Sequence, residues 1–353
     1  MNKLIKIWFR RLIKEWILIT VATGLVVTSL YLKRLPSYSI RDIEVIFIIF
    51  ILLMIVKGLE QSGFFAHIAY SLQNKKIMPF YLIVSTMILS MFITNDVALL
   101  LVIPITLKLK LRQKELLIIL ETLSANTGSA LTPFGNPQNL FIYWFYHLNP
   151  IEFIKVIAPF TLSFFIILSI SSIFIRVEDY FNLSKNRVSK RSFIYLFFLI
   201  IFVLSVLKLI PLWINIIILA YSIILDKDLF KIDYILLGIF FCFFGFTDNL
   251  LQVIKLKFEN SVQVFLYSSF LSQIISNVPA ALLFCDFTQN WKALLWGVNV
   301  GGLGNIIGSL ASLIAYRFIV LAKENVKSFM IKFHIIGYAA FLTGLLLYFL
   351  LAN

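Results

Sequence analysis

A polar stretch containing prolines and glycines interrupts an apolar segment in the first half of the chain. It covers residues 124–139, with the apolar runs 116–120 before it and 140–144 after it. Pro133 and Pro137 cannot continue a helix, and a backbone group left without a partner in hydrocarbon costs several kcal/mol. Irregular backbone at that depth is tolerated where it is buried in protein or lines a water-filled cavity. The stretch therefore predicts a helix broken at mid-membrane around a polar site; an ordinary loop between two short helices is the alternative.

The composition sets the class of protein. Of the 353 residues, 61% are hydrophobic and 14% are charged, whereas soluble domains carry about 25% charged residues. We expect an all-α polytopic membrane protein, embedded in the lipid bilayer of the cell (inner) membrane. The net charge of +14 lies in short clusters between apolar segments, as the positive-inside rule expects, and does not indicate a nucleic-acid partner.

Residues that could carry catalysis are sparse. Cys242 and Cys285 and the three histidines show no disulfide or metal-ligand spacing. The sequence contains no Ser/His/Asp or Cys/His constellation, and we expect neither an enzyme nor a cofactor. It also lacks the glycine-rich lysine motif that binds nucleotides, so any use of ATP would require a partner chain.

The apolar segments have two lengths, because a full span needs roughly 20 residues and several segments are shorter. We expect about nine spans, two of them broken helices, plus two re-entrant hairpins whose half-helices start and end on one side. The expected hairpins are 79–108 and 260–285, and the expected broken helices are 114–146 and 291–318. The other expected spans are 15–31, 43–60, 151–176, 193–208, 211–225, 232–250 and 333–351.

The polar motifs of the first half recur in the same order in the second half. Thr94-Asn95 and Ser276-Asn277 both end an apolar half-helix. The two broken helices share the patterns Asn126-x-Gly128-x3-Thr132-x2-Gly135-Asn136 and Asn299-x-Gly301-x3-Asn305-x2-Gly308-Ser309. We expect inverted repeats at 1–176 and 211–353, joined at 177–210 by a linker loop and one connecting span, which is an architecture of secondary transporters.

The basic residues orient the chain in the membrane. With the N-terminus in the cytoplasm and the C-terminus outside, large basic clusters such as 3–14, 75–76 and 176–191 lie inside, as the positive-inside rule expects. The first hairpin then enters from the cytoplasm and the second from outside. The outer cluster of Lys33, Arg34 and Arg41 does not fit this orientation.

The hairpin tips and broken helices would bring helix ends together at mid-membrane. N-terminal ends offer free N–H groups to an anion, while C-terminal ends and unwound carbonyls suit sodium. We expect substrate-binding residues at Thr94, Asn95, Asn136, Ser276, Asn277 and Asn305. We expect ion-binding residues, which hold sodium if the protein is sodium-coupled, at Asn95, Asp96, Asn126, Gly128, Thr132, Asn277, Asn299 and Gly301.

Several of these residues have a second interpretation. Asp96 is an ionisable group inside the membrane and hence a candidate proton or cation carrier, but it is also a suitable cap for the second half-helix. Gly304 and Gly308 could serve close helix packing instead of a ligand. Asp286 follows the second hairpin, where we expect it to be solvated.

The motifs resemble those of the ion transporter superfamily over almost the whole chain. The resemblance rests on residues 94–100 with Pro104, 125–129, 135–139, 276–279 and 299–309. The superfamily includes arsenical-pump membrane permeases, sodium/proton antiporters of the NhaD kind, citrate transporters and divalent anion/sodium symporters. Its symporters carry Ser-Asn-Thr at both tips, whereas this chain has Thr-Asn-Asp and Ser-Asn-Val. The Thr-Asn-Asp tip is closer to the arsenite-permease-like members.

The resemblance implies an elevator mechanism, often in a homodimer, in which hairpins and broken helices move against a scaffold of the other spans. The leading hypothesis is a secondary active transporter that takes up a small anionic solute, dicarboxylate-like, citrate-like or an oxyanion, by symport with sodium ions or protons. One alternative is a sodium/proton antiporter with Asp96 as proton carrier. Another is a channel-like conduit, or an arsenite-permease-like membrane subunit that works with a soluble ATPase.

Overall fold

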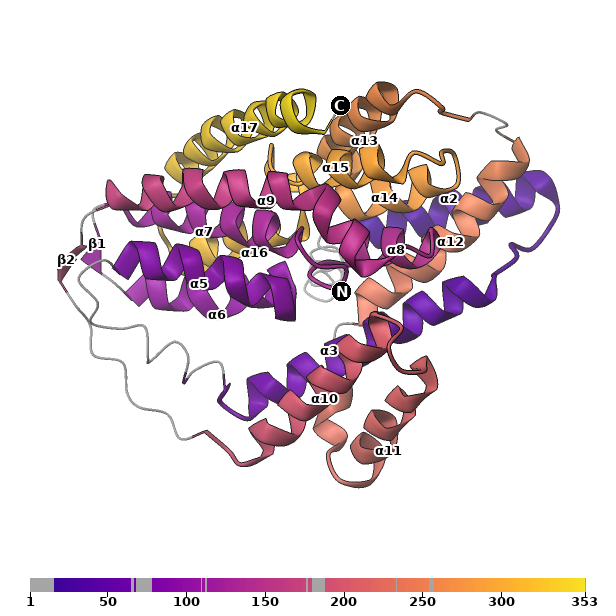
Figure 1. Cartoon of the computed structure of the whole chain (residues 1–353), viewed down its shortest axis with the longest axis horizontal. Helices are drawn as coiled ribbons and strands as arrows, with labels where there is room; N and C mark the ends of the chain where they lie inside the picture. Colours follow the sequence, from indigo (N-terminus) through magenta and orange to yellow (C-terminus); the bar gives the residue numbers. More distant parts are fainter. Residues whose placement is uncertain are drawn as a thin grey trace, which may run out of the picture.

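The structure is a computed structural model, and it describes residues 16–64, 67, 78–108, 110–111, 113–175, 177–179, 188–232, 234–253 and 257–352 (Figure 1). The expected basic clusters at 3–14 and 75–76 lie outside the described residues, as do Arg176, Lys185 and Arg187 of the cluster at 176–191. The predictions that depend on those residues stay predictions.

Helices make up nearly all of the described structure. The first half contains α2 (Trp16–Leu32), α3 (Ile40–Gln61), α5 (Met78–Ile93), α6 (Asn95–Lys108), α7 (Lys114–Ser129), α8 (Pro137–Phe145) and α9 (Pro150–Ile173). The second half contains α10 (Arg191–Val206), η1 (Leu212–Asn215), α11 (Ile216–Ile224), η2 (Lys227–Phe230), α12 (Tyr234–Val253), α13 (Ser261–Ile275), α14 (Asn277–Cys285), α15 (Trp291–Gly301), η3 (Ile306–Gly308), α16 (Leu310–Leu321) and α17 (Val326–Leu351). Two short strands, β1 (Lys110–Leu111) and β2 (Val177–Asp179), pair antiparallel.

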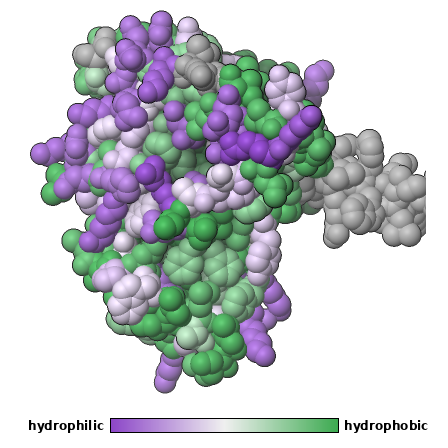
Figure 2. Space-filling view, turned by 90° about the vertical axis from the view of Figure 1, so that its right-hand side faces the viewer, coloured by the Kyte–Doolittle hydropathy of each residue, from purple (hydrophilic) through white to green (hydrophobic). Residues whose placement is uncertain are grey.

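These elements agree with the expected all-α fold. By length and composition, α9, α12 and α17 could each cross a membrane, and shorter apolar helices accompany them. The predicted half-helix pairs are present as α5–α6 and α13–α14, and the predicted breaks separate α7 from α8 and α15 from α16. Large hydrophobic side chains such as Ile170 and Leu346 are exposed on the outside of the bundle, and hydrophobic residues cover much of the centre and lower part of one face (Figure 2). The protein is therefore suited to a lipid environment.

Two boundaries differ most from the prediction. α7 continues to Ser129, so the break covers 130–136 and is shorter than the polar stretch 124–139. α17 begins at Val326, before the expected 333, because the Asn325 side chain caps it by accepting a hydrogen bond from the Ser328 N–H (3.0 Å).

The helices sort into two groups by their packing. We call α2, α3, α10, α11 and α12 the flanking group, because they pack on one another along the lower and right sides of Figure 1. We call α5 to α9 and α13 to α17 the central group. The groups meet where α3 packs on α8 and α12 packs on α14. There Trp144 donates to Glu44 (2.8 Å), and the rings of Phe141 and Phe244 lie 5.4 Å apart.

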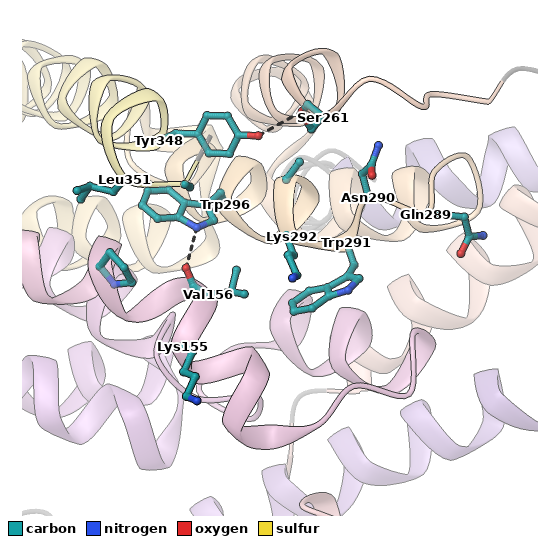
Figure 3. A pocket seen from close by; sticks show the side chains of 13 residues that line it. Lys155, Val156, Ser261, Gln289, Asn290, Trp291, Lys292, Trp296, Tyr348 and Leu351 are labelled. Carbon is teal, nitrogen blue, oxygen red and sulfur yellow. Dashed lines mark hydrogen bonds between the residues drawn. The ribbon is translucent and has the colours of Figure 1, made fainter.

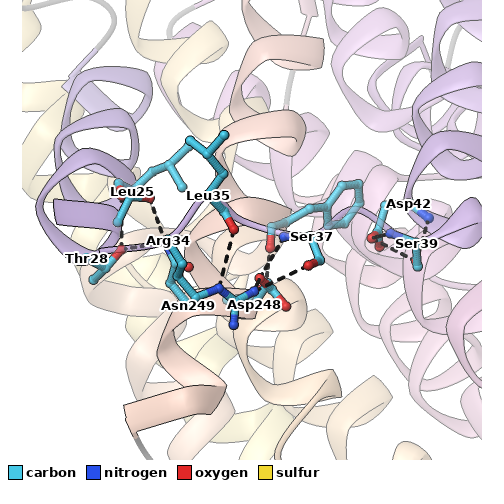
Figure 4. A network of polar contacts seen from close by, with 12 residues as sticks. Leu25, Thr28, Arg34, Leu35, Ser37, Ser39, Asp42, Asp248 and Asn249 are labelled. Atoms are coloured by element: carbon cyan, nitrogen blue, oxygen red, sulfur yellow. Dashed lines mark hydrogen bonds and ion pairs between the residues drawn. The ribbon is translucent and has the colours of Figure 1, made fainter. Parts of the chain in front are cut away.

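Polar contacts join the α2–α3 connection to α12 inside the flanking group (Figure 4). Arg34 forms an ion pair with Asp248, which also accepts a hydrogen bond from the Ser37 N–H (2.8 Å). Asn249 donates to the hydroxyl of Ser29 (2.8 Å). Arg41 lies over the ring of Phe145, at 4.8 Å from its centroid. The basic cluster that did not fit the charge rule is thus partly neutralised by contacts within the protein.

Loops assigned to the same side of the membrane contact one another. At the expected cytoplasmic end, Lys114 pairs with Glu324 (3.1 Å), and β1 pairs with β2. At the expected outer end, Lys292 pairs with Glu152 (3.3 Å). These contacts join loops that were assigned to the same side, while the two sides of the membrane and the orientation of the termini stay predictions.

Candidate functional site

The two helix pairs turn at equivalent residues with the same unusual backbone. Thr94 lies between α5 and α6 with φ 75°, and Ser276 lies between α13 and α14 with φ 77°. A residue other than glycine rarely adopts positive φ, which costs on the order of 1–3 kcal/mol and clusters at functional sites. Both side chains are buried, with 8% and 1% exposed. The next residues, Asn95 and Asn277, are also buried and begin α6 and α14.

The two breaks resemble each other in the same way. Asn136 caps α8, with its side-chain oxygen accepting the Asn139 N–H (2.9 Å). Ser309 caps α16, with its hydroxyl accepting the Ser312 N–H (3.2 Å). Asn136 and Ser309 occupy matching positions in the two sequence patterns and have extended backbones, with φ of −153° and −149°. Equivalent residues of the two motifs therefore have the same role, which is to cap the second half of each broken helix.

Asn126 connects the first tip to the second break. Its Oδ1 accepts a hydrogen bond from Asn95 Nδ2 (3.0 Å). Its Nδ2 donates to the Gly302 carbonyl (3.2 Å) and to the Ser309 hydroxyl (3.0 Å). The side chain is 4% exposed and is held at both ends.

Asn299 makes the reciprocal connection from the second broken helix to the first break. Its Nδ2 donates to Asn139 Oδ1 (2.8 Å) and to the Leu295 carbonyl (2.8 Å). Its Oδ1 accepts from Asn136 Nδ2 (3.4 Å), and Asn136 Nδ2 also donates to the Ser129 hydroxyl (3.0 Å). Each broken helix thus uses its asparagine to reach the capping residue of the other.

The second tip lies beside the second break. Ser276 Oγ is 3.5 Å from the Gly308 carbonyl, and a Cβ on Gly302 would lie 2.8 Å from Asn277 Nδ2. Since Asn126 binds the Gly302 carbonyl, both tips contact one connected set of polar groups. Asp96 is partly buried in the first turn of α6, and its N–H donates to Asn95 Oδ1 (3.0 Å).

The other predicted site residues make contacts within the fold. Asn305 donates to the Gln273 carbonyl (2.8 Å) and accepts the Gly308 N–H (2.8 Å), so its amide holds the second break. Thr132 donates to the Met91 carbonyl (2.6 Å).

Gly128 and Gly301 lie where a hairpin helix packs on a broken helix. A Cβ on Gly128 would lie 2.6 Å from Ser90 Oγ, and one on Gly301 would lie 2.8 Å from the Ser269 carbonyl. These two glycines therefore allow α5 to approach α7 and α13 to approach α15.

Helix ends dominate the electrostatics of this site. Eight helix ends meet around Asn95, Asn126, Asn136 and Asn299: the N-terminal ends of α6, α8, α14 and α16 and the C-terminal ends of α5, α7, α13 and α15. N-terminal ends carry partial positive charge and C-terminal ends partial negative charge. Among the described residues, no group of three or more His, Cys, Asp or Glu could hold a metal ion. The available ligands are thus amides, hydroxyls and main-chain groups, which can hold an anion or an alkali cation.

A cavity of about 570 Å³ lies elsewhere, at the ends of α9, α15 and α17 (Figure 3). Lys155, Trp291 and Lys292 line it, and Trp296 at its base donates to the Val156 carbonyl (2.9 Å). It contains none of the tip or break residues, so we keep the polar network as the candidate site.

Sequence reasoning missed three side chains of the central group. Asn139 and Gln273 hold the two breaks, and Glu121 is completely buried in α7. Glu121 gave a usable signal, because a carboxyl in an apolar helical segment is a functional candidate. Asn139 lies inside the predicted polar stretch 124–139, but the sequence does not reveal its contact with Asn299. Gln273 gave no signal, since its partners Gly301 and Asn305 are distant in sequence.

Interrupted helices that share a buried polar network inside an apolar bundle define a membrane transporter as the class of this protein. Residues 7–296 match the family model described as citrate transporter. The chain belongs to this citrate transporter family, within the ion transporter superfamily.

Its relatives are membrane proteins too. The chain is 35% identical over 310 residues to the uncharacterized transporter MJ0456 of Methanocaldococcus jannaschii, covering 84% of this chain and 86% of the relative. It is 31% identical over 287 residues to the inner membrane protein YbiR of Escherichia coli, covering 75% and 77% of the two chains. It is also 30% identical over 131 residues to the silicon efflux transporter LSI3 of rice, covering 35% of this chain and 27% of the relative. The protein is therefore a multi-pass membrane transporter.

Proposed function

We propose that this protein is a secondary active transporter of a small anionic solute, a dicarboxylate-like or citrate-like acid or an oxyanion, coupled to sodium ions or protons. The observation that carries the proposal is the reciprocal binding of Asn126 and Asn299 across the two breaks. The N-terminal helix ends around them would hold the anion, and amide and carbonyl oxygens would hold a sodium ion.

The matched tips and breaks support inverted repeats. The backbone of Thr94 resembles that of Ser276, and the cap at Asn136 resembles the cap at Ser309. The first hairpin opens toward the β1–β2 end of the bundle, while the second opens toward the end where Tyr146 of α8 donates to the Thr288 carbonyl (2.8 Å).

An elevator mechanism would use the two groups of helices. The central group would carry the solute across the membrane, and the flanking group would stay fixed. We assign α9 and α17 to the moving part, because both pack on α7. We further propose a homodimer in the cell (inner) membrane with the N-terminus in the cytoplasm.

The test is uptake by the reconstituted full-length protein. Asn126→Ala and Asn299→Ala should each lower uptake of citrate, succinate or arsenate into proteoliposomes by about tenfold or more, because each leaves buried groups unpaired at about 1–3 kcal/mol per group. Asn249→Ala is the matched control, since Asn249 is an equally buried amide in the flanking group. Full uptake by both test variants would contradict the proposal.

A sodium/proton antiporter is the second candidate, and the position of Asp96 next to Asn95 favours it. Proton flux driven by sodium without any added anion, and lost in Asp96→Asn, would support this function over anion symport.

An arsenite-permease-like subunit is the third candidate. It draws on the Thr94-Asn95-Asp96 tip and on the similarity to the rice efflux transporter. Arsenite efflux that needs a soluble ATPase would support it.

A further inference from the structure

A carboxyl group lies in the middle of α7, more than one helical turn from the candidate site. Glu121 is 0% exposed, and the Thr106 hydroxyl on α6 donates a hydrogen bond to its Oε1. Its Oε2 has no hydrogen-bond partner within the part of the chain that the structure describes. The same holds for the buried hydroxyl of Ser124, one turn further along α7.

Among the described residues, no basic side chain forms an ion pair with this carboxyl. The helices that pack on α7 are α5, α6, α9, α16 and α17. The charged and imidazole side chains that the structure describes on these helices are Asp96, Glu152, Lys155, Arg317, Lys327, Lys332 and His334. On α7 itself, Glu115 is paired with Lys332 (2.7 Å) at the start of the helix.

An unpaired carboxylate in such surroundings is unfavourable by several kcal/mol, and the group avoids this by holding a proton. We infer that Glu121 is a proton-binding site, and that its proton is the coupling ion of transport. The reaction is the addition of one proton to the carboxylate, with Oε2 free to carry it. The inference rests on the proposed function and selects protons over sodium.

The position of Glu121 explains how a proton could be coupled to the solute. Asn126 lies five residues further along α7, about 7.5 Å at 1.5 Å per residue, and binds Asn95 at the first tip. Asn95 and Thr106 both belong to α6. α6 and α7 are therefore joined at two levels, by Asn95–Asn126 at the tip and by Thr106–Glu121 below it. A solute that displaces α6 at the tip would change the hydrogen bond from Thr106 to Glu121, and hence the affinity of Glu121 for the proton.

The experiment compares the wild type with Glu121→Gln in proteoliposomes without sodium. Gln mimics the protonated acid, so uptake of citrate or arsenate driven by a pH gradient should fall about tenfold, within the range of coupling between sites. Exchange of the same solute at equal pH should stay near the wild-type rate. Infrared difference spectra should contain the C=O band of a protonated carboxylic acid that changes with pH and is absent from Glu121→Gln.

Glu115→Gln is the control, because it neutralises a carboxyl of the same helix that is already paired. It should keep gradient-driven uptake. The inference would be overturned if Glu121→Gln kept the full gradient-driven uptake, or if its infrared spectrum still contained the band seen in the wild type. If the wild type transports none of these solutes, the proposed function fails, while the infrared band still tests the proton site. If Glu121→Gln does not fold, Thr106→Val replaces it, and a band that Thr106→Val does not shift would overturn the assignment to Glu121.

Discussion

Ser276 has a strained backbone within the candidate site. Its φ of 77° and ψ of 156° lie in a region that only glycine adopts without cost. Ser276→Gly should therefore stabilise the protein by about 1 kcal/mol, seen as a higher thermal midpoint in detergent. If the hydroxyl meets the solute, the same variant should lose uptake. Thr86→Gly is the control: Thr86 is helical and buried, so glycine there should destabilise the protein by about 1 kcal/mol or more. A lower midpoint for Ser276→Gly would mean that the backbone is not strained.

At the scale of elements, helix packing around the breaks depends on glycines. A Cβ on Gly297 of α15 would lie 2.8 Å from the Phe265 carbonyl of α13. Gly297→Ala should therefore push the two helices apart and destabilise the protein by about 1–3 kcal/mol. At Gly238 of α12 the nearest atom would be 3.5 Å away, so Gly238→Ala should be neutral or stabilise by up to about 1 kcal/mol. Thermal unfolding of Gly297→Ala and Gly238→Ala checks both expectations, and equal thermal midpoints of the two variants would contradict them.

The elements also show what could be predicted from the sequence. The helices, both tips and both breaks were predictable, because apolar length and polar interruption are local signals. The end of α7 was not: Asn126 and Gly128 look like helix breakers, yet they stay helical because the tertiary partners Asn95 and Ser90 accommodate them. Asp286 was expected to be solvated but is largely covered, since the sequence does not reveal which helices pack over a loop.

At the scale of the whole molecule, Asp286 places a titratable group between the two groups of helices. It follows α14 of the central group, and its charged neighbours Arg41, Asp42 and Asp248 belong to the flanking group. Burial, reinforced by Asp42, raises the pKa of Asp286 from 3.8 to about 6, although Arg41 acts in the opposite direction. The native state therefore binds this proton more tightly than the unfolded chain does. Stability should fall as the pH rises between these two values, so neutral pH should weaken the contact between the groups.

Asp286→Asn tests this contact because it fixes the side chain in a neutral form. At pH 7 the variant should be more stable than the wild type by about 3 kcal/mol, and at pH 5 the difference should shrink, since the folded wild type is then largely protonated. The thermal midpoints of the variant and the wild type at the two pH values measure this difference in stability. Asp228→Asn serves as the control, because Lys231 lowers the pKa of Asp228 and acid cannot stabilise that pair. If the stability difference between Asp286→Asn and the wild type were the same at both pH values, Asp286 would not contribute to the contact between the groups. If the central group moves against the flanking group, Asp286→Asn should also make uptake less dependent on the outer pH.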